Sequence, residues 1–222
     1  MIRLENIKKT YLKKENKIDV LKGITEDFEE GKFYAVIGKS GVGKSTLIKI
    51  MGLIEDATSG KIYIDNNEIS NLNDSEKSNI RNKKIGFIFQ DYLLDENMTV
   101  LENVMLPTIK EKITDSKIEY IYSLLDNYGL SNRINHFPHQ LSGGECQRVA
   151  ICRALVNNPN IILADEPTGN LDKENEIYVF KSLKNESQKG KCVIVVSHSD
   201  RVKDYADTLL EIVDGKVSGI KK

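Results

Sequence analysis

The sequence predicts an α/β fold in which an antiparallel β portion precedes a mostly parallel sheet, and a helical subdomain is inserted into the second half of the chain. Three observations predict it. Two segments at the start of the chain read as antiparallel strands. Short apolar runs that suit buried parallel strands recur along the chain. Helical periodicity dominates residues 91–140. At 222 residues the chain is long enough for one domain with a subdomain.

The first part of the chain is predicted to form antiparallel strands. The segments Ile2 to Ile7 and Val20 to Phe28 read as two antiparallel strands, and Lys61 to Ile64 extends this β portion. The lysines between the first two strands are expected to belong to a solvated hairpin: Lys8, Lys9, Lys13, Lys14 and Lys17.

The next element is a strand, loop and helix unit that binds phosphate. The apolar run Phe33 to Ile37 leads into a match to G-x-x-x-x-G-K-[ST], and a helical pattern follows through Met51. Backbone N–H groups of such a loop point at phosphate oxygens, aided by the helix N-terminus. We expect Lys44 to reach the β- and γ-phosphates and Ser45 to ligate Mg²⁺. The loop residues are Gly38, Lys39, Ser40, Gly41, Val42, Gly43, Lys44, Ser45 and Thr46.

Two carboxylates follow another apolar run. Ile161 to Ala164 suits a strand buried on both faces, and it ends in Asp165-Glu166-Pro167. We expect Asp165 to hold the Mg²⁺ shell and Glu166 to polarise a water, which is worth roughly 10²- to 10⁴-fold in rate. Alone, the pair is as typical of an acidic helix cap; beside the phosphate loop, the catalytic interpretation is favoured.

Two more strands end in polar side chains. The run Ile85 to Phe89 ends at Gln90, an amide suited to a metal or an attacking water. The run Val193 to Ser197 ends at His198, which can donate to a γ-phosphate oxygen. Ligands of open α/β sheets lie outside the carboxyl ends of the strands, so these side chains are expected to converge on one crevice.

A second candidate phosphate cradle lies in Leu141 to Glu145. Ser142-x-x-Glu145 before a helical pattern is an ordinary capping box, worth about 1 kcal/mol. A cap does not need Gly143 and Gly144 in the first helical turn, where each costs up to about 1 kcal/mol relative to alanine. Bare backbone there indicates a close approach by phosphate.

These motifs resemble the ATP-binding cassette (ABC) ATPases, in the order of that family and over nearly the whole chain. Gly38 to Ser45 resembles Walker A, Gln90 the Q-loop and Leu141 to Glu145 the signature motif. Asp165 and Glu166 resemble the Walker B pair, Gly169 to Asp172 the D-loop, and His198 the switch histidine. In this resemblance Glu145 stands where glutamine is commoner, and Cys146 follows it.

The resemblance implies a P-loop NTPase (RecA-like) core and a head-to-tail dimer that sandwiches ATP. Ser142, Gly143 and Gly144 of one subunit then close over ATP held by the partner's Walker A. The resemblance assigns catalysis to Glu166, His198, Lys44 and Gln90. It assigns the binding of the metal ion to Ser45, Gln90 and Asp165. Tyr11 stands where such proteins stack an aromatic ring on adenine. Residues 1–90 and 157–222 are then the catalytic core, and about 91–156 the helical subdomain.

The subgroup resemblance is to macrolide exporters, lipoprotein-releasing systems and bacitracin-type peptide exporters. It depends on Ala164 to Asp172 and Gln90 to Asp95. It implies a separately encoded membrane permease, with Leu94 and Met98 at its docking groove, although ordinary subdomain core is an equal alternative for each. The substrate is then a peptide, an antibiotic or a lipid-linked compound. The alternative function is an ATPase module of a signalling or cell-division membrane complex that drives no transport.

Composition narrows the location and the partners. The formal charge of −1, from 32 Lys and Arg against 33 Asp and Glu, argues against nucleic acid as a partner. No apolar run reaches the ~18 residues of a membrane span, and the three cysteines lack metal-ligand spacing. We therefore expect a cytoplasmic protein, peripheral at the inner face of the cell membrane through its permease.

Overall fold

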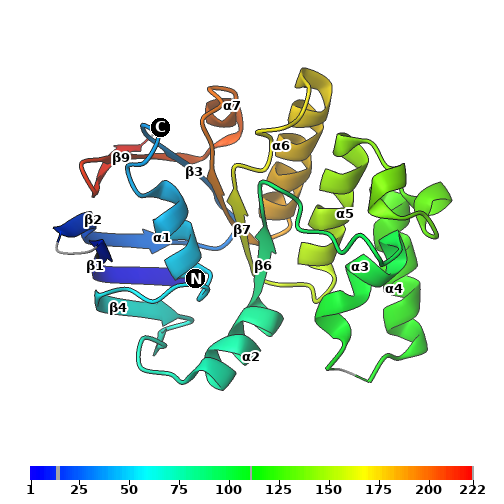
Figure 1. The fold of residues 1–222 in the computed structure, drawn as a ribbon, viewed down its shortest axis with the longest axis horizontal. Coiled ribbons are helices and arrows are strands. Elements are labelled where there is room, and N and C mark those ends of the chain that lie inside the picture. The colour runs from blue at the N-terminus through cyan, green and yellow to red at the C-terminus, as the bar shows by residue number, and fades with distance from the viewer. Residues whose placement is uncertain (14–15, 111, 222) are drawn as a thin grey trace.

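The computed structural model describes residues 1–13, 16–110 and 112–221, so Lys14 of the predicted lysine cluster lies outside it. The described chain forms two sheets flanked by helices (Figure 1). The smaller sheet has the order β2-β1-β4-β5, and the larger has the order β10-β9-β3-β8-β7-β6. The strands are β1 (Ile2–Lys13), β2 (Asn16–Phe28), β3 (Phe33–Ile37), β4 (Ser59–Ile64), β5 (Asn67–Glu68), β6 (Ile85–Ile88), β7 (Ile161–Asp165), β8 (Cys192–Val196), β9 (Thr208–Val213) and β10 (Lys216–Lys221).

The helices alternate with the strands of the larger sheet and fill the insertion. They are α1 (Lys44–Met51), α2 (Asp74–Lys84), α3 (Val100–Met105), α4 (Asp115–Asn127), α5 (Gly143–Leu155), α6 (Lys173–Gln188) and α7 (Val202–Tyr205). Short 3₁₀ turns follow α3 and precede α5: Leu106–Thr108, Ser131–Arg133 and Pro138–Gln140. Between β6 and α5 the described residues form helices and connecting loops but no strand, as expected.

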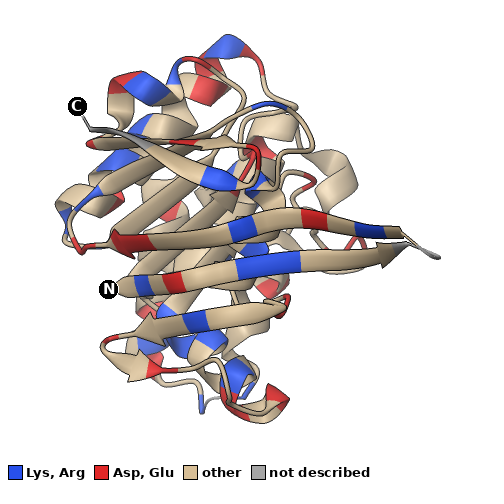
Figure 2. Ribbon diagram, turned by 90° about the vertical axis from the view of Figure 1, so that its left-hand side faces the viewer, with Lys and Arg blue, Asp and Glu red and all other residues tan. Residues whose placement is uncertain are grey.

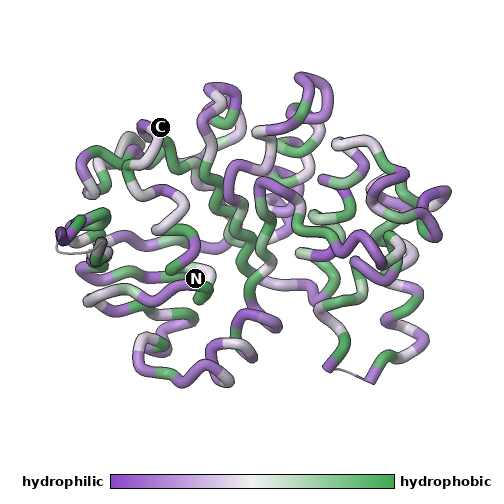
Figure 3. Tube along the Cα trace, viewed as in Figure 1, coloured by the Kyte–Doolittle hydropathy of each residue, from purple (hydrophilic) through white to green (hydrophobic). Residues whose placement is uncertain are grey.

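The larger sheet separates two hydrophobic cores. Successive residues of a strand point to opposite faces, so Phe33 and Ala35 of β3 pack with α5 and α6, whereas Tyr34 and Val36 pack with α1 and the smaller sheet. The strands β7 and β8 are buried along their whole length, which agrees with the predicted apolar runs. In Figure 3 these central strands form the most continuously hydrophobic part of the trace.

Five strands of the larger sheet run parallel, and only β10 pairs antiparallel, with β9. The carboxyl ends of β3, β6, β7 and β8 therefore lie at one edge, where the sequence places the phosphate loop, Gln90, Asp165 and His198. This shared edge positions the candidate site.

The first hairpin and helix α2 differ from the prediction. Strand β1 continues past Ile7, and strand β2 starts before Val20. The two strands therefore pair along a long hairpin that reaches Lys13 and Asn16. Lysines and acidic residues are interspersed along both strands (Figure 2). Helix α2 was not predicted because it has no buried residue. Its signal is the capping box Asn73-x-x-Glu76, in which the Glu76 backbone N–H donates to Asn73 Oδ1 at 3.0 Å.

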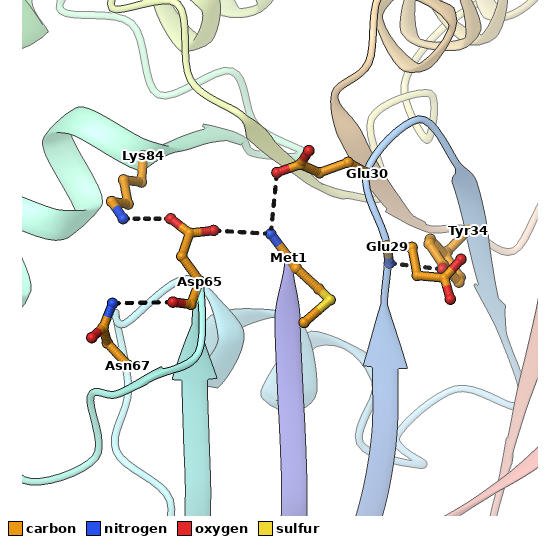
Figure 4. Close-up of polar contacts among 7 residues, drawn as sticks. All are labelled: Met1, Glu29, Glu30, Tyr34, Asp65, Asn67 and Lys84. Atoms are coloured by element: carbon orange, nitrogen blue, oxygen red, sulfur yellow. Dashed lines mark hydrogen bonds and ion pairs between the residues drawn. The ribbon is translucent and has the colours of Figure 1, made fainter.

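The amino terminus ties the smaller sheet to α2 (Figure 4). The ammonium of Met1 lies 3.2 Å from Asp65 Oδ1 and 3.7 Å from Glu30 Oε1. The other oxygen of Asp65 accepts from Lys84 Nζ at 2.5 Å, and this hydrogen bond, more than any other influence, lowers the pKa of Asp65. The three elements β1, β4 and α2 are thus joined by one carboxylate.

Candidate nucleotide-binding site

The loop after β3 presents uncapped amides. Among the described helices of eight residues or more, only α1 lacks a side-chain cap: its N-cap is Gly43 at φ 110°. The first N–H groups of α1 have no intrahelical partner and carry the positive end of the helix dipole. A Cβ at Gly43 would lie 2.8 Å from a methyl of Leu21, and one at Gly38 would lie 2.6 Å from the Ile212 carbonyl, so this loop path requires glycine at both positions.

Lys44 is folded into the loop. Its Nζ donates to the carbonyls of Gly38, at 2.9 Å, and Lys39, at 3.1 Å, and lies 3.2 Å from His198 Nε2. Burial lowers its pKa, while Glu166 and Asp165 oppose that shift. The ammonium donates to backbone carbonyls and forms no ion pair with a carboxylate of the described residues, so its charge is suited to an anion such as a triphosphate.

Ser45 and Asp165 join the loop to β7. Ser45 Oγ donates to Asp165 Oδ1 at 2.9 Å, across 120 residues of sequence. Asp165 is buried, and burial raises its pKa, so its carboxylate is costly without a cation. Ser45, Asp165 and Gln90 line one cavity of about 640 Å³. Their side-chain oxygens form an all-oxygen donor set of the kind that Mg²⁺ prefers.

Glu166 and His198 face each other from β7 and β8. The His198 backbone N–H donates to Glu166 Oε2 at 3.0 Å, and His198 Nε2 lies 3.2 Å from Oε1. Oε1 is buried and accepts no hydrogen bond from the described residues. Glu166 has φ 49°, an uncommon conformation for glutamate. One carboxylate oxygen of Glu166 thus has no hydrogen-bond partner among the described residues.

The imidazole of His198 can serve either neighbour. If Nδ1 carries the proton, Nε2 accepts from Lys44 Nζ, and the same Nε2 lies 3.2 Å from Glu166 Oε1. The side chain is exposed, so it reaches solvent and ligand alike.

These groups surround a cavity of about 630 Å³, within the usual range for small-molecule sites. Its lining includes nine residues predicted for the site: Ser40, Gly41, Gly43, Lys44, Ser45, Thr46, Gln90, Glu166 and His198. Sequence reasoning missed Val20 as a lining residue and named Gly169 only as part of the D-loop motif. A Cβ at Gly169 would lie 3.2 Å from Gln90 Nε2, a proximity that no local pattern reveals.

Tyr11 lies beside the loop on the hairpin. Its hydroxyl donates to Glu55 Oε1 at 2.6 Å and lies 3.4 Å from Thr46 Oγ1, and Lys9 Nζ lies 5.0 Å from the ring centroid. The ring is 37% exposed. It is thus an accessible aromatic surface next to the first turn of α1.

The second predicted cradle does not line this cavity. Ser142 caps α5, and Glu145 accepts from its backbone N–H and hydroxyl, both at 2.8 Å. Arg133 Nε also donates to Glu145, at 2.7 Å. The predicted capping box is therefore present. Asp172 likewise caps α6, where it accepts from the Asn175 backbone N–H at 2.9 Å.

Gly143 and Gly144 differ in their surroundings. Gly143 is exposed, and a Cβ there would lie 3.2 Å from the Tyr92 hydroxyl. Gly144 is buried, and a Cβ there would lie 2.2 Å from Asn175 Oδ1. Packing of α5 against α6 thus favours glycine at Gly144. The Ser142 backbone N–H and hydroxyl already donate to Glu145 within the chain.

Comparison with known proteins gives consistent matches. A family model described as ABC transporter matches residues 21–169. The lipoprotein-releasing system ATP-binding protein LolD of Aquifex aeolicus is 41% identical over 99% of this chain and 96% of its own length. The macrolide export ATP-binding/permease protein MacB of Bdellovibrio bacteriovorus is 42% identical over 98% of this chain, which spans 33% of that longer protein.

Among solved structures, a dimeric structure of the ABC transporter cassette MJ0796 has a TM-score of 0.92 and 41% identity, and covers 100% of this chain and 98% of that one. A second dimeric structure of MJ0796, bound to ADP and Pi, is described as a post-hydrolysis state. In the chain that the structure describes, no helix is both long enough and apolar enough to span a bilayer.

Proposed function

The chain belongs to the ABC transporter family as an ATP-binding, ATP-hydrolysing subunit, and from this premise we propose that two copies close on ATP and part after hydrolysis to drive a separately encoded membrane permease. The observation that carries the proposal is the meeting of Lys44, Glu166 and His198 around one cavity.

In this proposal the γ-phosphate lies against Lys44 and His198. The Glu166 carboxylate accepts a proton from the attacking water, the water oxygen bonds to the γ-phosphorus, and the bond to the bridging oxygen of ADP breaks. Lys44 and His198 stabilise the charge that develops on the γ-phosphate. Mg²⁺, held by Ser45, Asp165 and Gln90, would neutralise phosphate charge.

The adenine ring would stack on Tyr11, whose exposed ring lies beside the first turn of α1. Ser142, Gly143 and Gly144 would close over the nucleotide of the other copy, because they stand at the N-terminus of α5 and do not line this chain's own cavity. Glu145 and Asp172 would support that surface through their contacts within the chain.

By likeness to LolD and MacB, we propose export or extraction of a peptide, an antibiotic or a lipid-linked substrate, with the chain peripheral at the inner face of the cell membrane. Residues 91–156 would form the subdomain that faces the permease. Identification of the membrane protein that co-purifies with the chain tests this part: a permease with a transport pathway supports it, and a partner without one favours a signalling role.

The hydrolytic step is tested with Glu166→Gln. The amide keeps the shape of the side chain but accepts a proton far less readily, so phosphate release should fall by about 10² or more. Light scattering should then show a dimer that persists with ATP. Turnover at the parental rate would remove Glu166 from the role of base.

A further inference from the structure

A second cavity, of about 700 Å³, lies between α4, α5 and α6, away from the nucleotide site. Two of its lining residues, Asn158 and Lys191, precede β7 and β8. The nucleotide site lies at the carboxyl ends of the same strands. Each strand has five residues, which at about 3.3 Å per residue separates the two sites by roughly 16 Å. The cavity is therefore a distinct site.

Three tyrosines line the cavity: Tyr120 and Tyr128 from the α4 region and Tyr178 from α6. The rings of Tyr128 and Tyr178 meet edge to face, with centroids 6.5 Å apart at 75°. Aromatic rings of this kind offer flat apolar contact together with a polar tip. A planar ring fits such walls.

Tyr128 supplies an unused donor. The residue is only 7% exposed, and its hydroxyl makes no hydrogen bond to any described residue. Burial raises its pKa, so the hydroxyl stays protonated. The hydroxyl oxygen is not among the fully buried side-chain atoms that lack a partner, so it is reachable from the cavity and available to donate to a ligand.

The charge of the lining is positive. Lys181, Lys189 and Lys191 face a single carboxylate, Glu186, which accepts from Lys189 at 2.6 Å. Lys191 donates only to neutral oxygens, Asn158 Oδ1 at 2.7 Å and Pro159 O at 2.9 Å, and burial lowers its pKa. Lys181 forms no ion pair in the described chain. Two of the three cations thus lack an acidic partner.

We propose that this cavity binds a small anion that carries a planar ring, with its phosphate or carboxylate group at Lys181 and Lys191 and its ring between Tyr120, Tyr128 and Tyr178. The amides and hydroxyls of the lining, among them Asn127, Asn185 and Ser123, complete the polar contacts. The proposal does not depend on the ATPase cycle, because none of these residues lines the nucleotide cavity.

The test uses phenyl phosphate as the probe and the full chain saturated with Mg²⁺-ADP, which occupies the nucleotide site. Isothermal titration should show saturable binding of phenyl phosphate about tenfold tighter than that of inorganic phosphate or benzyl alcohol, because only the first probe uses both ring and charge. If inorganic phosphate bound as tightly as phenyl phosphate, the cavity would recognise the charge alone and not the ring, and the proposal would be overturned. Absence of saturable binding would overturn it too.

Matched variants locate the binding. Tyr128→Phe removes only the hydroxyl, and Lys191→Met removes the charge; each should weaken phenyl phosphate about tenfold or more. Tyr122→Phe is the control, since Tyr122 is an exposed tyrosine of the same helix outside the lining. Lys181→Met, at an exposed position, provides a variant with little risk to folding. Equal affinity in all four variants would place the probe elsewhere and refute the site.

Discussion

At the scale of single residues, Glu145 shows how a charge can be present without acting on the ligand. In the resemblance to the signature motif, Glu145 stands where glutamine is commoner, which would add a negative charge near bound phosphate. In the structure the carboxylate turns back onto the Ser142 amide and onto Arg133. The Ser142 amide, above all other influences, lowers the pKa of Glu145 to about 2, with Arg133 contributing. Most of its charge is therefore compensated within the chain.

Glu145→Gln tests this account through stability. The carboxylate has a lower pKa in the folded chain than its ordinary value of 4.5, so its contribution is complete above about pH 4.5 and is lost as the pH falls towards about 2. We expect the variant to lose about 1 kcal/mol at pH 7, and the difference from the parent to shrink below pH 4.5. Urea titrations at pH 7, 4 and 3 measure it.

The control for that titration is Glu119→Gln, because Glu119 is exposed on α4 and makes no ion pair in the described chain. It should match the parent at every pH. A Glu145→Gln difference that stays constant from pH 7 to pH 3 would contradict the proposed compensation.

At the scale of elements, the helices α5 and α6 make a close contact at one glycine. Gly144 in the first turn of α5 faces Asn175 of α6, whose side chain is held by the cap residue Asp172 at 3.0 and 3.1 Å. Asn175 also accepts from Arg148 at 3.4 Å. The close approach therefore fixes the start of α5 relative to the start of α6.

Gly144→Ala separates packing from helix propensity. Alanine in a free helix would gain up to about 1 kcal/mol over glycine, but here its Cβ would meet Asn175 Oδ1 at 2.2 Å. We expect a net loss of about 1–3 kcal/mol in the free energy of unfolding. The second substitution Asn175→Ser shortens the opposing side chain and should recover part of that loss, as a double-mutant cycle by chemical denaturation can measure.

The control is Gly143→Ala, which makes the same substitution at the neighbouring, exposed position of the helix. It should leave the free energy of unfolding unchanged or raise it slightly. If Gly144→Ala were as stable as Gly143→Ala, the packing explanation for Gly144 would be wrong.

The elements differ in how far sequence predicts them. β7 and β8 are buried on both faces, so an uninterrupted apolar run marks them. Helix α2 has no fully buried residue, and its one apolar side chain, Ile80, is partly buried against the core. It therefore leaves no apolar stripe, and only its cap gives a signal. The outer half of the β1–β2 hairpin has exposed residues such as Leu12 and Ile18, and its pairing depends on backbone hydrogen bonds that side-chain alternation does not reveal.

At the scale of the whole molecule, the parallel sheet converts separate motifs into one site. Ser45 and Asp165 are 120 residues apart and share a hydrogen bond, and Lys44 and His198 are 154 apart. Strand-end polarity predicts this convergence, because all parallel strands end at one edge. The cavity between α4, α5 and α6 was not predicted, since its lysines and tyrosines come from surfaces that meet only when the helices pack.

The proposed shared pocket predicts complementation between two inactive chains. Lys44→Ala removes the phosphate-binding ammonium, and Gly143→Asp places a carboxylate where the partner's phosphate would lie while leaving the Ser142 cap intact. Each variant alone should release little phosphate. In a mixed dimer, the intact Lys44 of one copy faces the intact Gly143 of the other, so one pocket is whole and the second carries both defects.

Equal mixing of the two variants should therefore restore phosphate release to about a quarter of the parental rate, given random pairing in a two-fold dimer and independent pockets. An aspartate in the first helical turn is favoured by the helix dipole, so Gly143→Asp should retain its melting temperature, which a thermal scan checks. Mixing the same variants as covalently linked homodimers, which cannot exchange, is the control and should restore nothing. If free mixtures release no more phosphate than the sum of the separate variants at every ratio, each copy hydrolyses ATP with its own residues and the shared pocket is refuted.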